Sequence, residues 1–372
     1  MAAPSEFSVL SRGPVMIWGP PPDSGSAPPT HRHGTTAEGV TPIMNARAFR
    51  KTAVIAGLAA ASAFVASPAH AASGTYTPFV FDQTSGGQPT IYDFINSATS
   101  SLDMTMYELE DTTAEQDLVN LASNGVTVRV ILDQAEQSKN QTAYDTLTNG
   151  GVSVAWSSTS FVYTHQKTIT VDDSQSMILS GNLTSQYYST GRDYGVVDTD
   201  SSDVSAIEAV FDADFNGTSI TPSDGDNLAW SPTDSQSRLL SVINGAGSTL
   251  DIEEEELSDS ALVNAVVAKA EAGVAVRVVV ESPSSWTSAI NKIKNAGGSV
   301  VGYSGTTGLY IHAKAIVADY GLSDATVEVG SMNWTANSLT NNRELGIILT
   351  DSGVLSTIET QFDSDYSGGT TE

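Results

Sequence analysis

Hydrophobic residues follow two different spacings along residues 101–215, and each spacing predicts a different element. Alternating hydrophobic residues and β-branched runs predict strands, whereas Leu118 and Leu121, three positions apart, predict a helix with one buried face. Strands and helices that alternate in this way predict a mixed, largely parallel sheet with helices on both faces. The predicted elements are strand 101–108, helix 114–123, strand 126–132, strands 167–171 and 177–180, and helix 202–215.

The same series returns 148 residues later in the chain. Leu102-Asp103 recurs as Leu250-Asp251, and Val128-Arg129-Val130 recurs as Val276-Arg277-Val278. We therefore expect an α/β fold of two tandem units, each a mixed β-sheet flanked by helices, related by a pseudo-two-fold axis. The elements predicted in the second copy are strand 250–257, helix 261–272, strand 274–280, and strands 315–317 and 326–330.

The segment before residue 72 has the features of a processing signal rather than of a fold. A basic stretch from Met44 precedes an apolar run of small residues at 53–66, which ends in an A-x-A site at Ala71. This run is shorter than the ~18–20 residues of a membrane span, so we expect a signal peptide that is cleaved near Ala71 and a secreted protein. A buried helix and an uncleaved anchor are the alternatives. The predicted domains are 1–43, a disordered leader or an over-extended start; 44–71, the signal peptide; 72–222, the first repeat; and 223–372, the second repeat.

Charge narrows the range of partners. The chain of 372 residues has a formal net charge of −27, and residues 72–372 hold only eleven basic residues. Strong acidity disfavours binding to nucleic acid and to anionic membrane surfaces. The chain has no cysteine, which excludes disulfides and thiolate chemistry.

Two histidines remain after the predicted cleavage, and both lie in the same short pattern. His165 and Lys167 in the first copy, and His312 and Lys314 in the second, each belong to a run His-x-Lys-x-x-x-x-Asp. On a strand, residues two apart point to the same face. An imidazole beside an ammonium group disfavours a metal cation, and it suits a phosphoryl group attacked by nitrogen. We expect neither a metal nor another cofactor.

Polar residues recur downstream of both histidines. Asn182 and Asn333 add amide donors at matching places, so two halves would surround one phosphate with two histidines, two lysines and two asparagines. Capping of the following helices is the alternative role for the asparagines. Asp193 and Glu344 come later in each copy, and ordinary surface acids are the alternative interpretation of these two.

Together these residues resemble the signature of the phospholipase D superfamily, a duplicated HxKxxxxD followed by GSxN and a later acidic residue. The resemblance covers essentially all of residues 72–372. It implies that one histidine attacks phosphorus and forms a covalent phospho-histidine, while the other protonates the leaving alcohol. It suggests His165 as nucleophile and His312 as acid.

The resemblance also assigns the remaining residues of the motif. Asp193 and Glu344 would each bind the distal ring nitrogen of the histidine in their own copy, whereas Asp172 and Asp319 look structural. Two departures bear on the phosphate pocket: Leu179 replaces the usual glycine, and the second copy has a longer turn before Gly330. The implied catalytic residues are His165, His312, Lys167, Lys314, Asp193 and Glu344, and the implied phosphate-binding residues are Asn182, Asn333, Ser180 and Ser331.

Four consecutive glutamates, Glu253–Glu256, lie in a predicted strand opposite Thr105–Glu108 of the first copy. A solvated edge is the favoured interpretation. The alternative is that alternate members face the cleft, where they would favour a cationic head group.

The sequence thus favours a secreted bacterial phospholipase D. We expect its substrates to be phospholipids at a membrane or micelle surface, and we expect it to act as a monomer. It would release phosphatidic acid and the head-group alcohol, with transphosphatidylation to other alcohols. The alternatives are a secreted nuclease or other phosphodiesterase of the same superfamily, and a binding module without catalysis.

Overall fold

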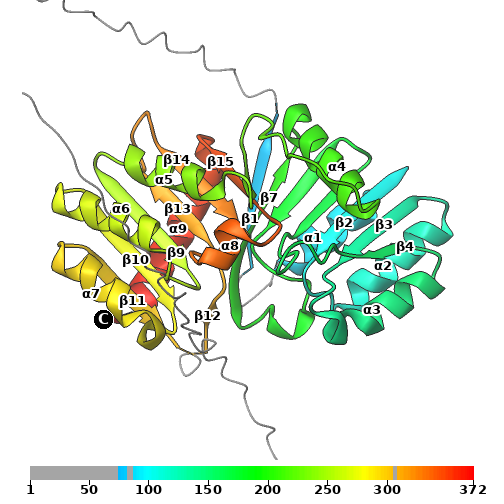
Figure 1. The fold of residues 1–372 in the computed structure, drawn as a ribbon, viewed down its shortest axis with the longest axis horizontal. Coiled ribbons are helices and arrows are strands. Elements are labelled where there is room, and N and C mark those ends of the chain that lie inside the picture. The colour runs from blue at the N-terminus through cyan, green and yellow to red at the C-terminus, as the bar shows by residue number, and fades with distance from the viewer. Residues whose placement is uncertain (1–73, 82–86, 305–307) are drawn as a thin grey trace, which may run out of the picture. The chain divides into compact units, whose positions relative to one another are not determined.

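The computed structural model describes residues 74–81, 87–304 and 308–372, which belong to one compact unit. The predicted leader and signal peptide lie outside the described residues. Within this unit the chain forms two sheets, each carrying its own helices (Figure 1). The predicted boundary at residues 222 and 223 falls in the segment between the last helix of the first repeat and the first strand of the second.

The first repeat builds a sheet with the strand order β1-β7-β6-β5-β2-β3-β4. Its helices are α1 (Gln88–Asn96), α2 (Thr112–Ser123), α3 (Gln137–Asn149) and α4 (Ser201–Phe215). Its strands are β1 (Tyr76–Phe81), β2 (Ser101–Met106), β3 (Thr127–Leu132), β4 (Ser153–Trp156), β5 (Thr168–Val171), β6 (Gln175–Leu179) and β7 (Gly191–Asp198).

The second repeat follows the same order, with β16 (Thr370–Thr371) added at one edge: β16-β11-β10-β9-β13-β14-β15-β8. Its helices are α5 (Ser235–Gly245), α6 (Ser260–Glu271), α7 (Thr287–Asn295), α8 (Ala336–Thr340) and α9 (Ser352–Gly368). Its strands are β8 (Leu228–Ser231), β9 (Thr249–Glu254), β10 (Ala275–Glu281), β11 (Ser299–Tyr303), β13 (Ala315–Ala318), β14 (Thr326–Gly330) and β15 (Glu344–Leu349). The short strand β12 (Tyr310–Ile311) leaves this repeat and pairs with β7 of the first.

The mixed sheets confirm the predicted fold class, but the expectation of largely parallel strands is wrong. Only β2-β3-β4 and β9-β10-β11 are joined by parallel pairs within each sheet, through the helices α2, α3, α6 and α7. The strands around the histidine motifs are antiparallel, because a tight turn joins β5 to β6 and a longer turn, residues 319–325, joins β13 to β14, with no helix in either connection. A hairpin forces antiparallel pairing, whereas a helical crossover allows parallel pairing.

Three main cores hold the layers together. Helices α1, α2 and α3 cover the outer face of the first sheet, and α5, α6 and α7 cover the outer face of the second. A third core lies between the sheets, where α4 and α9 pack against β6, β7, β13, β14 and β15. The two repeats therefore share one hydrophobic core and make a common structure.

A partly buried arginine joins each sheet to its last helix by binding acids on both. Arg129 on β3 binds Asp103 on β2 through two nitrogens and reaches Asp212 on α4 at 2.6 Å. Its guanidinium lies 4.9 Å from the centroid of the Phe211 ring. The second repeat reproduces the arrangement with Arg277, Asp251, Asp363 and Phe362.

Asp172 and Asp319, the last residues of the two histidine motifs, fix the loops that enter β2 and β9. The Asp172 carboxylate accepts bonds from the backbone N–H groups of Thr99, Ser100 and Ser101. The Asp319 carboxylate does the same for Gly247, Ser248 and Thr249. These contacts agree with the structural role inferred for both residues.

The outer core of the second repeat contains two carboxyl groups where the first contains thioethers. Glu328 pairs with Ile316 in the same register in which Met177 pairs with Ile169. Glu254 ends β9 as Met106 ends β2. Both glutamates are almost completely buried, and burial raises the pKa of Glu328 to about 8. They therefore stay protonated at neutral pH.

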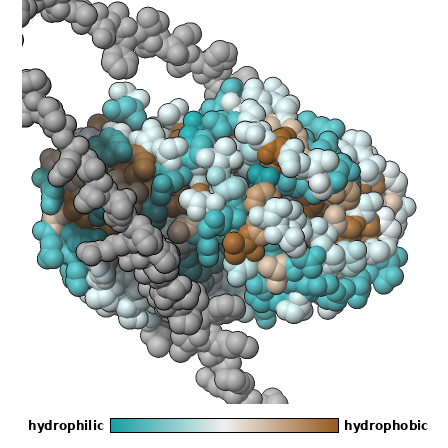
Figure 2. Space-filling view, in the orientation of Figure 1, coloured by the Kyte–Doolittle hydropathy of each residue, from teal (hydrophilic) through white to brown (hydrophobic). Residues whose placement is uncertain are grey.

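Most of the face in Figure 2 that is not covered by grey atoms is hydrophilic or neutral, with hydrophobic residues in small separate patches. The large hydrophobic side chains that are exposed in the described ranges are Val162, Tyr187, Tyr310, Tyr320 and Leu322. None of the described helices is long and apolar enough to cross a membrane.

Replacing Glu328 by the methionine of the first repeat (Glu328→Met) should stabilise the fold by about 1–4 kcal/mol at pH 8. The pKa of Glu328 is raised on folding, so the native state keeps a proton that the unfolded chain loses above pH 4.5. Native stability therefore falls as the pH rises from 4.5 to about 8, and the substitution removes this loss. Urea unfolding at pH 5 and pH 8 should show a larger gain at pH 8.

The matched control is Glu271→Met, which removes the same charge at an exposed position at the end of α6. Equal gains at both pH values, or a gain in the control as large as in Glu328→Met, would contradict the interpretation.

Candidate active site

Each histidine of the duplicated motif binds a carboxylate from the other repeat. His165 Nδ1 lies 2.9 Å from Glu344 Oε2, and His312 Nδ1 lies 2.8 Å from Asp193 Oδ1. The prediction that each acid binds the histidine of its own copy is therefore wrong. The two chemical units of the site are His165 with Glu344 and His312 with Asp193, and neither repeat can assemble one alone.

Backbone pairing between the repeats explains the exchange. The segment around His312 runs beside β7, with Ile311 opposite Arg192 and the His312 N–H donating to the Arg192 carbonyl. By the pseudo-two-fold relation, Thr164 forms a bridge with Arg343, and the Gln166 N–H donates to the Arg343 carbonyl. Both histidines thus lie just before β5 and β13 rather than inside them, next to the other repeat's acid.

The arginines that precede the two acids strengthen this crossing. Arg192 donates to Asp365 on α9 of the second repeat, and Arg343 donates to Asp214 on α4 of the first. All four side chains are largely buried. A buried ion pair repays the cost of desolvation only when its geometry is good. Each arginine must therefore stay in place, and this fixes the backbone that carries the neighbouring acid, Asp193 or Glu344.

Ser180 and Ser331 hold the acids in place. The Ser180 hydroxyl donates to Asp193 Oδ1 at 2.7 Å and accepts from the Tyr194 N–H, while Ser331 donates to Glu344 Oε2 at 2.9 Å. Both serines are fully buried. Their hydroxyl protons are therefore committed to carboxylates, and the structure assigns them to positioning the acids in place of the predicted phosphate contact.

The asparagines do not cap the helices that follow them. Thr335 is the N-cap of α8, and its side chain accepts from the Ser338 N–H. Asn333 instead points its amide nitrogen toward Glu255, and the Asn182 side chain lines a cavity beside His312. The capping alternative is excluded for Asn333, and binding of phosphate by both asparagines stays a prediction.

The charge states of the first half suit nucleophilic attack. Burial lowers the pKa of His165 to about 4, Lys167 adds to the shift, and Glu344 opposes it. Burial alone would raise the pKa of Glu344, but His165 and Lys167 hold it below its ordinary value. Glu344 is therefore an ionised acceptor for the Nδ1 proton, which leaves a lone pair on Nε2 of a neutral imidazole.

Lys167 is a buried cation whose positive charge is only partly balanced by nearby acids. Its ammonium donates to the His165 carbonyl and lies 5.1 Å from the centroid of the Tyr107 ring. Burial lowers the pKa of Lys167 to about 7, because Glu344 offsets only part of the desolvation and Lys314 adds repulsion. An anionic ligand at this place would restore the missing charge partner.

The second half contains a carboxylate that the first half lacks. Glu255 Oε2 lies 2.9 Å from Lys314 Nζ and 3.6 Å from His312 Nε2. The favoured prediction of a solvated edge for Glu253–Glu256 is therefore wrong: Glu253 and Glu254 are buried, and Glu255 faces the site. The repeat alignment contained the signal, since it places Glu255 opposite Tyr107.

A cavity of about 510 Å³ opens beside His312. Asn182, Asp193 and His312 form one side of it. The rest of the lining is rich in aromatic rings, from Phe81, Tyr187, Tyr188 and Tyr310. It also contains an ion pair between Glu108 and Lys139. Such a lining suits a ligand that is partly apolar.

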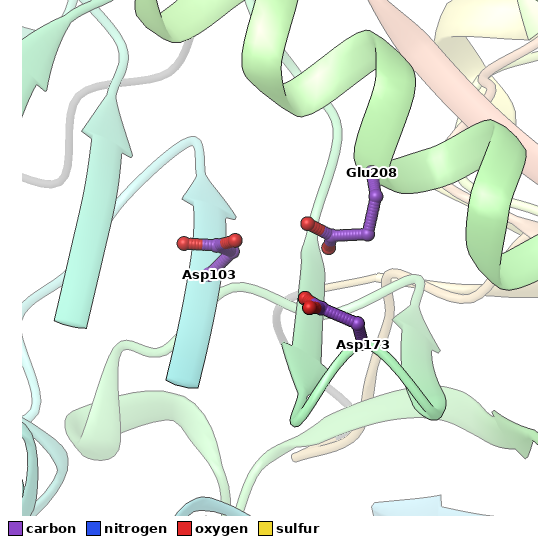
Figure 3. A group of neighbouring side chains, drawn as sticks. All are labelled: Asp103, Asp173 and Glu208. Atoms are coloured by element: carbon purple, nitrogen blue, oxygen red, sulfur yellow. The ribbon is translucent and has the colours of Figure 1, made fainter. Parts of the chain in front are cut away.

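Away from this cavity, Asp103, Asp173 and Glu208 point toward one another (Figure 3). Their oxygens lie within 4.8 Å of each other, as in a possible cation site. Arg129 already binds both Asp103 oxygens, and burial together with Asp103 raises the pKa of Glu208 to about 8. Arg129 and a proton on Glu208 thus supply positive charge at this cluster. That catalysis does not depend on a metal stays a prediction.

Comparison with known proteins identifies a family. The family model described as "Cardiolipin synthase, PLD-like domain" matches residues 91–215 and 239–366, one segment in each repeat. A curated relative, the mitochondrial cardiolipin hydrolase of Chlamydomonas reinhardtii, is 30% identical over 131 residues, which are 35% of this chain and 56% of that protein. The chain thus spans little more than half the length of this relative.

Two solved structures share the fold across both repeats. The phosphatidylserine synthase of Haemophilus influenzae Rd KW20 gives a TM-score of 0.63 at 10% identity, covering 80% of this chain and 87% of that one. A polyphosphate kinase from Porphyromonas gingivalis gives 0.61 at 13% identity, covering 78% of this chain and 50% of that one. At these identities the likeness establishes the fold alone.

Glu344→Gln should lower kcat on a phosphodiester such as bis(p-nitrophenyl) phosphate by about 10²–10⁴-fold, because the amide no longer fixes the Nδ1–H tautomer of His165. The matched control is Asp172→Asn, which belongs to the same motif but binds only the loop before β2. It should lower stability and leave kcat per folded molecule unchanged. An unchanged kcat in Glu344→Gln would exclude the cross-repeat pair from catalysis.

The pH profile of kcat/KM should be bell-shaped, with its two limbs near the shifted pKa values of His165 and Lys167. Activity should rise as His165 loses its proton at about pH 4, and fall as Lys167 loses its positive charge at about pH 7. Initial rates between pH 3 and pH 10 measure both limbs for the free enzyme. Rates that keep rising to pH 9 would contradict these assignments.

Proposed function

This chain belongs to the phospholipase D-like family, and on that premise we propose that it is a secreted phospholipase D. It hydrolyses phospholipids to phosphatidic acid and the free head-group alcohol through a covalent phospho-histidine. The observation that carries this proposal is the pair of histidine–carboxylate units, each assembled from both repeats, with a lysine beside each histidine.

In the first step, His165 Nε2 attacks phosphorus and forms a P–N bond. The bond from phosphorus to the head-group oxygen breaks, and His312 donates its proton to that oxygen. Lys167 and Lys314, with Asn182 and Asn333, hold the phosphate oxygens while charge moves onto them. Asp193 accepts from His312 Nδ1 and stabilises the ring while it carries a proton to give.

In the second step, His312 takes a proton from water, and the water oxygen attacks phosphorus. The P–N bond breaks, phosphatidic acid leaves, and His165 returns to its neutral form. An alcohol in place of water gives a transphosphatidylation product by the same route. Splitting the displacement in this way replaces one difficult step by two easier ones.

A lipid substrate is favoured by the surroundings of the site. Three of the exposed large hydrophobic side chains, Val162, Tyr187 and Tyr310, lie within a few residues of a motif histidine or line the cavity. Such residues at the mouth of a site suit contact with a lipid interface. The aromatic cavity supports the same choice.

Nucleic acid is disfavoured as substrate because most basic side chains in the described ranges are engaged within the protein. Arg129, Arg192, Arg277 and Arg343 bind acids of neighbouring helices, and Lys269 binds two backbone carbonyls. Phosphate contacts by free lysine and arginine dominate nucleic-acid affinity. The nuclease is therefore the alternative to be tested second.

Secretion completes the proposal. It rests on the basic stretch after Met44, the short apolar run and the A-x-A site at Ala71. The sequence of the purified extracellular protein should begin near Ala72, and an intact N-terminus would contradict processing.

The decisive experiment incubates the mature protein with phosphatidylcholine vesicles and some ethanol, followed by mass spectrometry. Phosphatidic acid and phosphatidylethanol should both form, because ethanol competes with water for the phospho-histidine. The control variant His165→Asn keeps the polar side chain without the nucleophilic nitrogen and should give neither product.

Phosphatidic acid without phosphatidylethanol would argue against the covalent intermediate. Absence of any lipid product, with cleavage of plasmid or single-stranded DNA, would replace the phospholipase by the nuclease.

A further inference from the structure

Glu255 breaks the symmetry of the site. It follows β9 at the place where Tyr107 follows β2, so one half carries a carboxylate and the other a phenol ring. The Tyr107 ring lies 4.6 Å from the His165 ring, centroid to centroid, and brings no formal charge. The two half-sites therefore differ in charge although their histidines, lysines and asparagines match.

The Glu255 carboxylate is surrounded by donors that the proposed mechanism assigns to the substrate. Its Oε2 atom lies 2.9 Å from Lys314 Nζ, 3.2 Å from Asn333 Nδ2 and 3.6 Å from His312 Nε2. Its Oε1 atom accepts from the Tyr310 hydroxyl. A phosphate oxygen held by Lys314 and Asn333 would need the place that Oε2 occupies.

The carboxylate stays charged in this setting. Burial alone would raise the pKa of Glu255, but Lys314 and His312 hold it well below its usual range. The pKa of Lys314 moves in the opposite direction: burial alone would lower it, but Glu255 raises it above its ordinary value. Glu255 and Lys314 therefore form an ion pair at neutral pH.

Charge balance then limits which substrates fit. The site holds three carboxylates, Asp193, Glu344 and Glu255, against the ammonium groups of Lys167 and Lys314 and the proton that His312 carries as the proposed acid. A phosphodiester adds one more negative charge. When it takes Lys314 from Glu255, the carboxylate loses its lysine partner close to the phosphate and keeps only the Tyr310 hydroxyl and the more distant His312 ring. Losing the closest cation is costly in a buried site.

A substrate with a positively charged leaving alcohol removes this cost. Its ammonium group can pair with Glu255 while its phosphate pairs with Lys314, so the number of ion pairs is conserved. The neighbouring cavity offers room for such a group, because Tyr310 both donates to Glu255 and lines the cavity together with Tyr187 and Tyr188. Aromatic faces bind quaternary ammonium groups favourably.

We propose that Glu255 is the residue that selects the head group: it exchanges Lys314 for a cationic group on the leaving alcohol as the phosphate binds Lys314 and Asn333. The enzyme would then prefer zwitterionic phospholipids over those whose head group is neutral or anionic. This inference rests on the proposed function for the identity of the substrate, but the exchange of partners is a binding property that can be measured without turnover.

The binding experiment uses isothermal titration calorimetry with tungstate as the oxyanion, with and without choline, at constant ionic strength. In the wild type, choline should raise tungstate affinity about tenfold, because each ion relieves the other's unpaired partner. Glu255→Gln should bind tungstate about tenfold more tightly than the wild type without choline, and choline should no longer change its affinity.

Glu256→Gln is the matched control. It changes the next glutamate in the chain, which forms no ion pair with Lys314 among the described residues. It should keep the coupling between choline and tungstate. An unchanged tungstate affinity in Glu255→Gln, or coupling that survives in it, would overturn the inference.

The turnover experiment compares kcat/KM for phosphatidylcholine and phosphatidylglycerol in the same mixed micelles. The wild type should prefer phosphatidylcholine by about tenfold or more, and Glu255→Gln should bring the ratio close to one. A ratio unaffected by Glu255→Gln, with both lipids hydrolysed, would overturn the inference and leave the proposed function standing. Coupled binding of choline and tungstate without hydrolysis of any lipid would overturn the proposed function and support the exchange.

Discussion

The structure of the site depends on carboxylates that cross between the repeats. Glu344 reaches His165 and Asp193 reaches His312, and each acid is preceded by an arginine bound to the last helix of the opposite repeat. Nδ1 of both histidines faces a carboxylate only because the two repeats pack in this way. The shared core around α4 and α9 is consequently part of the catalytic design, since a shift between the sheets would separate each histidine from its acid.

Symmetry of the backbone coexists with asymmetry of charge. Both repeats keep the arginine–acid pair between sheet and helix, and both use the aspartate of the histidine motif to fix the loop before a central strand. The second repeat, however, places Glu254 and Glu328 where the first has methionines, and Glu255 where the first has Tyr107. Buried carboxyl groups lower stability unless they are protonated or paired. Glu254 and Glu255 both act on Lys314, so the second half carries acids at a place where the first half has none.

The sequence predicted the repeats and part of their elements, and it named the histidines and acids that the structure brings together, because each left a local pattern of spacing. It could not predict which acid meets which histidine. Asp193 and Glu344 lie at similar distances along the chain from the histidine of their own copy, and only the packing of the two sheets shows that the partners are exchanged. The direction of the strands was misjudged for a related reason, since the tight turn after Val171 forces β5 and β6 to pair antiparallel whatever the helices on either side suggest. Glu255 was missed because four glutamates in a row look like a solvated edge until β9 is placed at the centre of a sheet.

The net charge of the whole chain and the local charge at Glu255 both favour a zwitterionic lipid as the proposed substrate. At long range, a protein with a net charge of −27 is repelled by anionic membranes and meets neutral, zwitterionic surfaces without that barrier. The described arginines do little to change this, because Arg129, Arg192, Arg277 and Arg343 are bound to the protein's own acids. At short range, the proposed exchange at Glu255 would disfavour an oxyanion that arrives without a cation. A chain built for an anionic lipid would need neither feature, whereas a chain that removes a positively charged alcohol from a zwitterionic lipid gains selectivity from both.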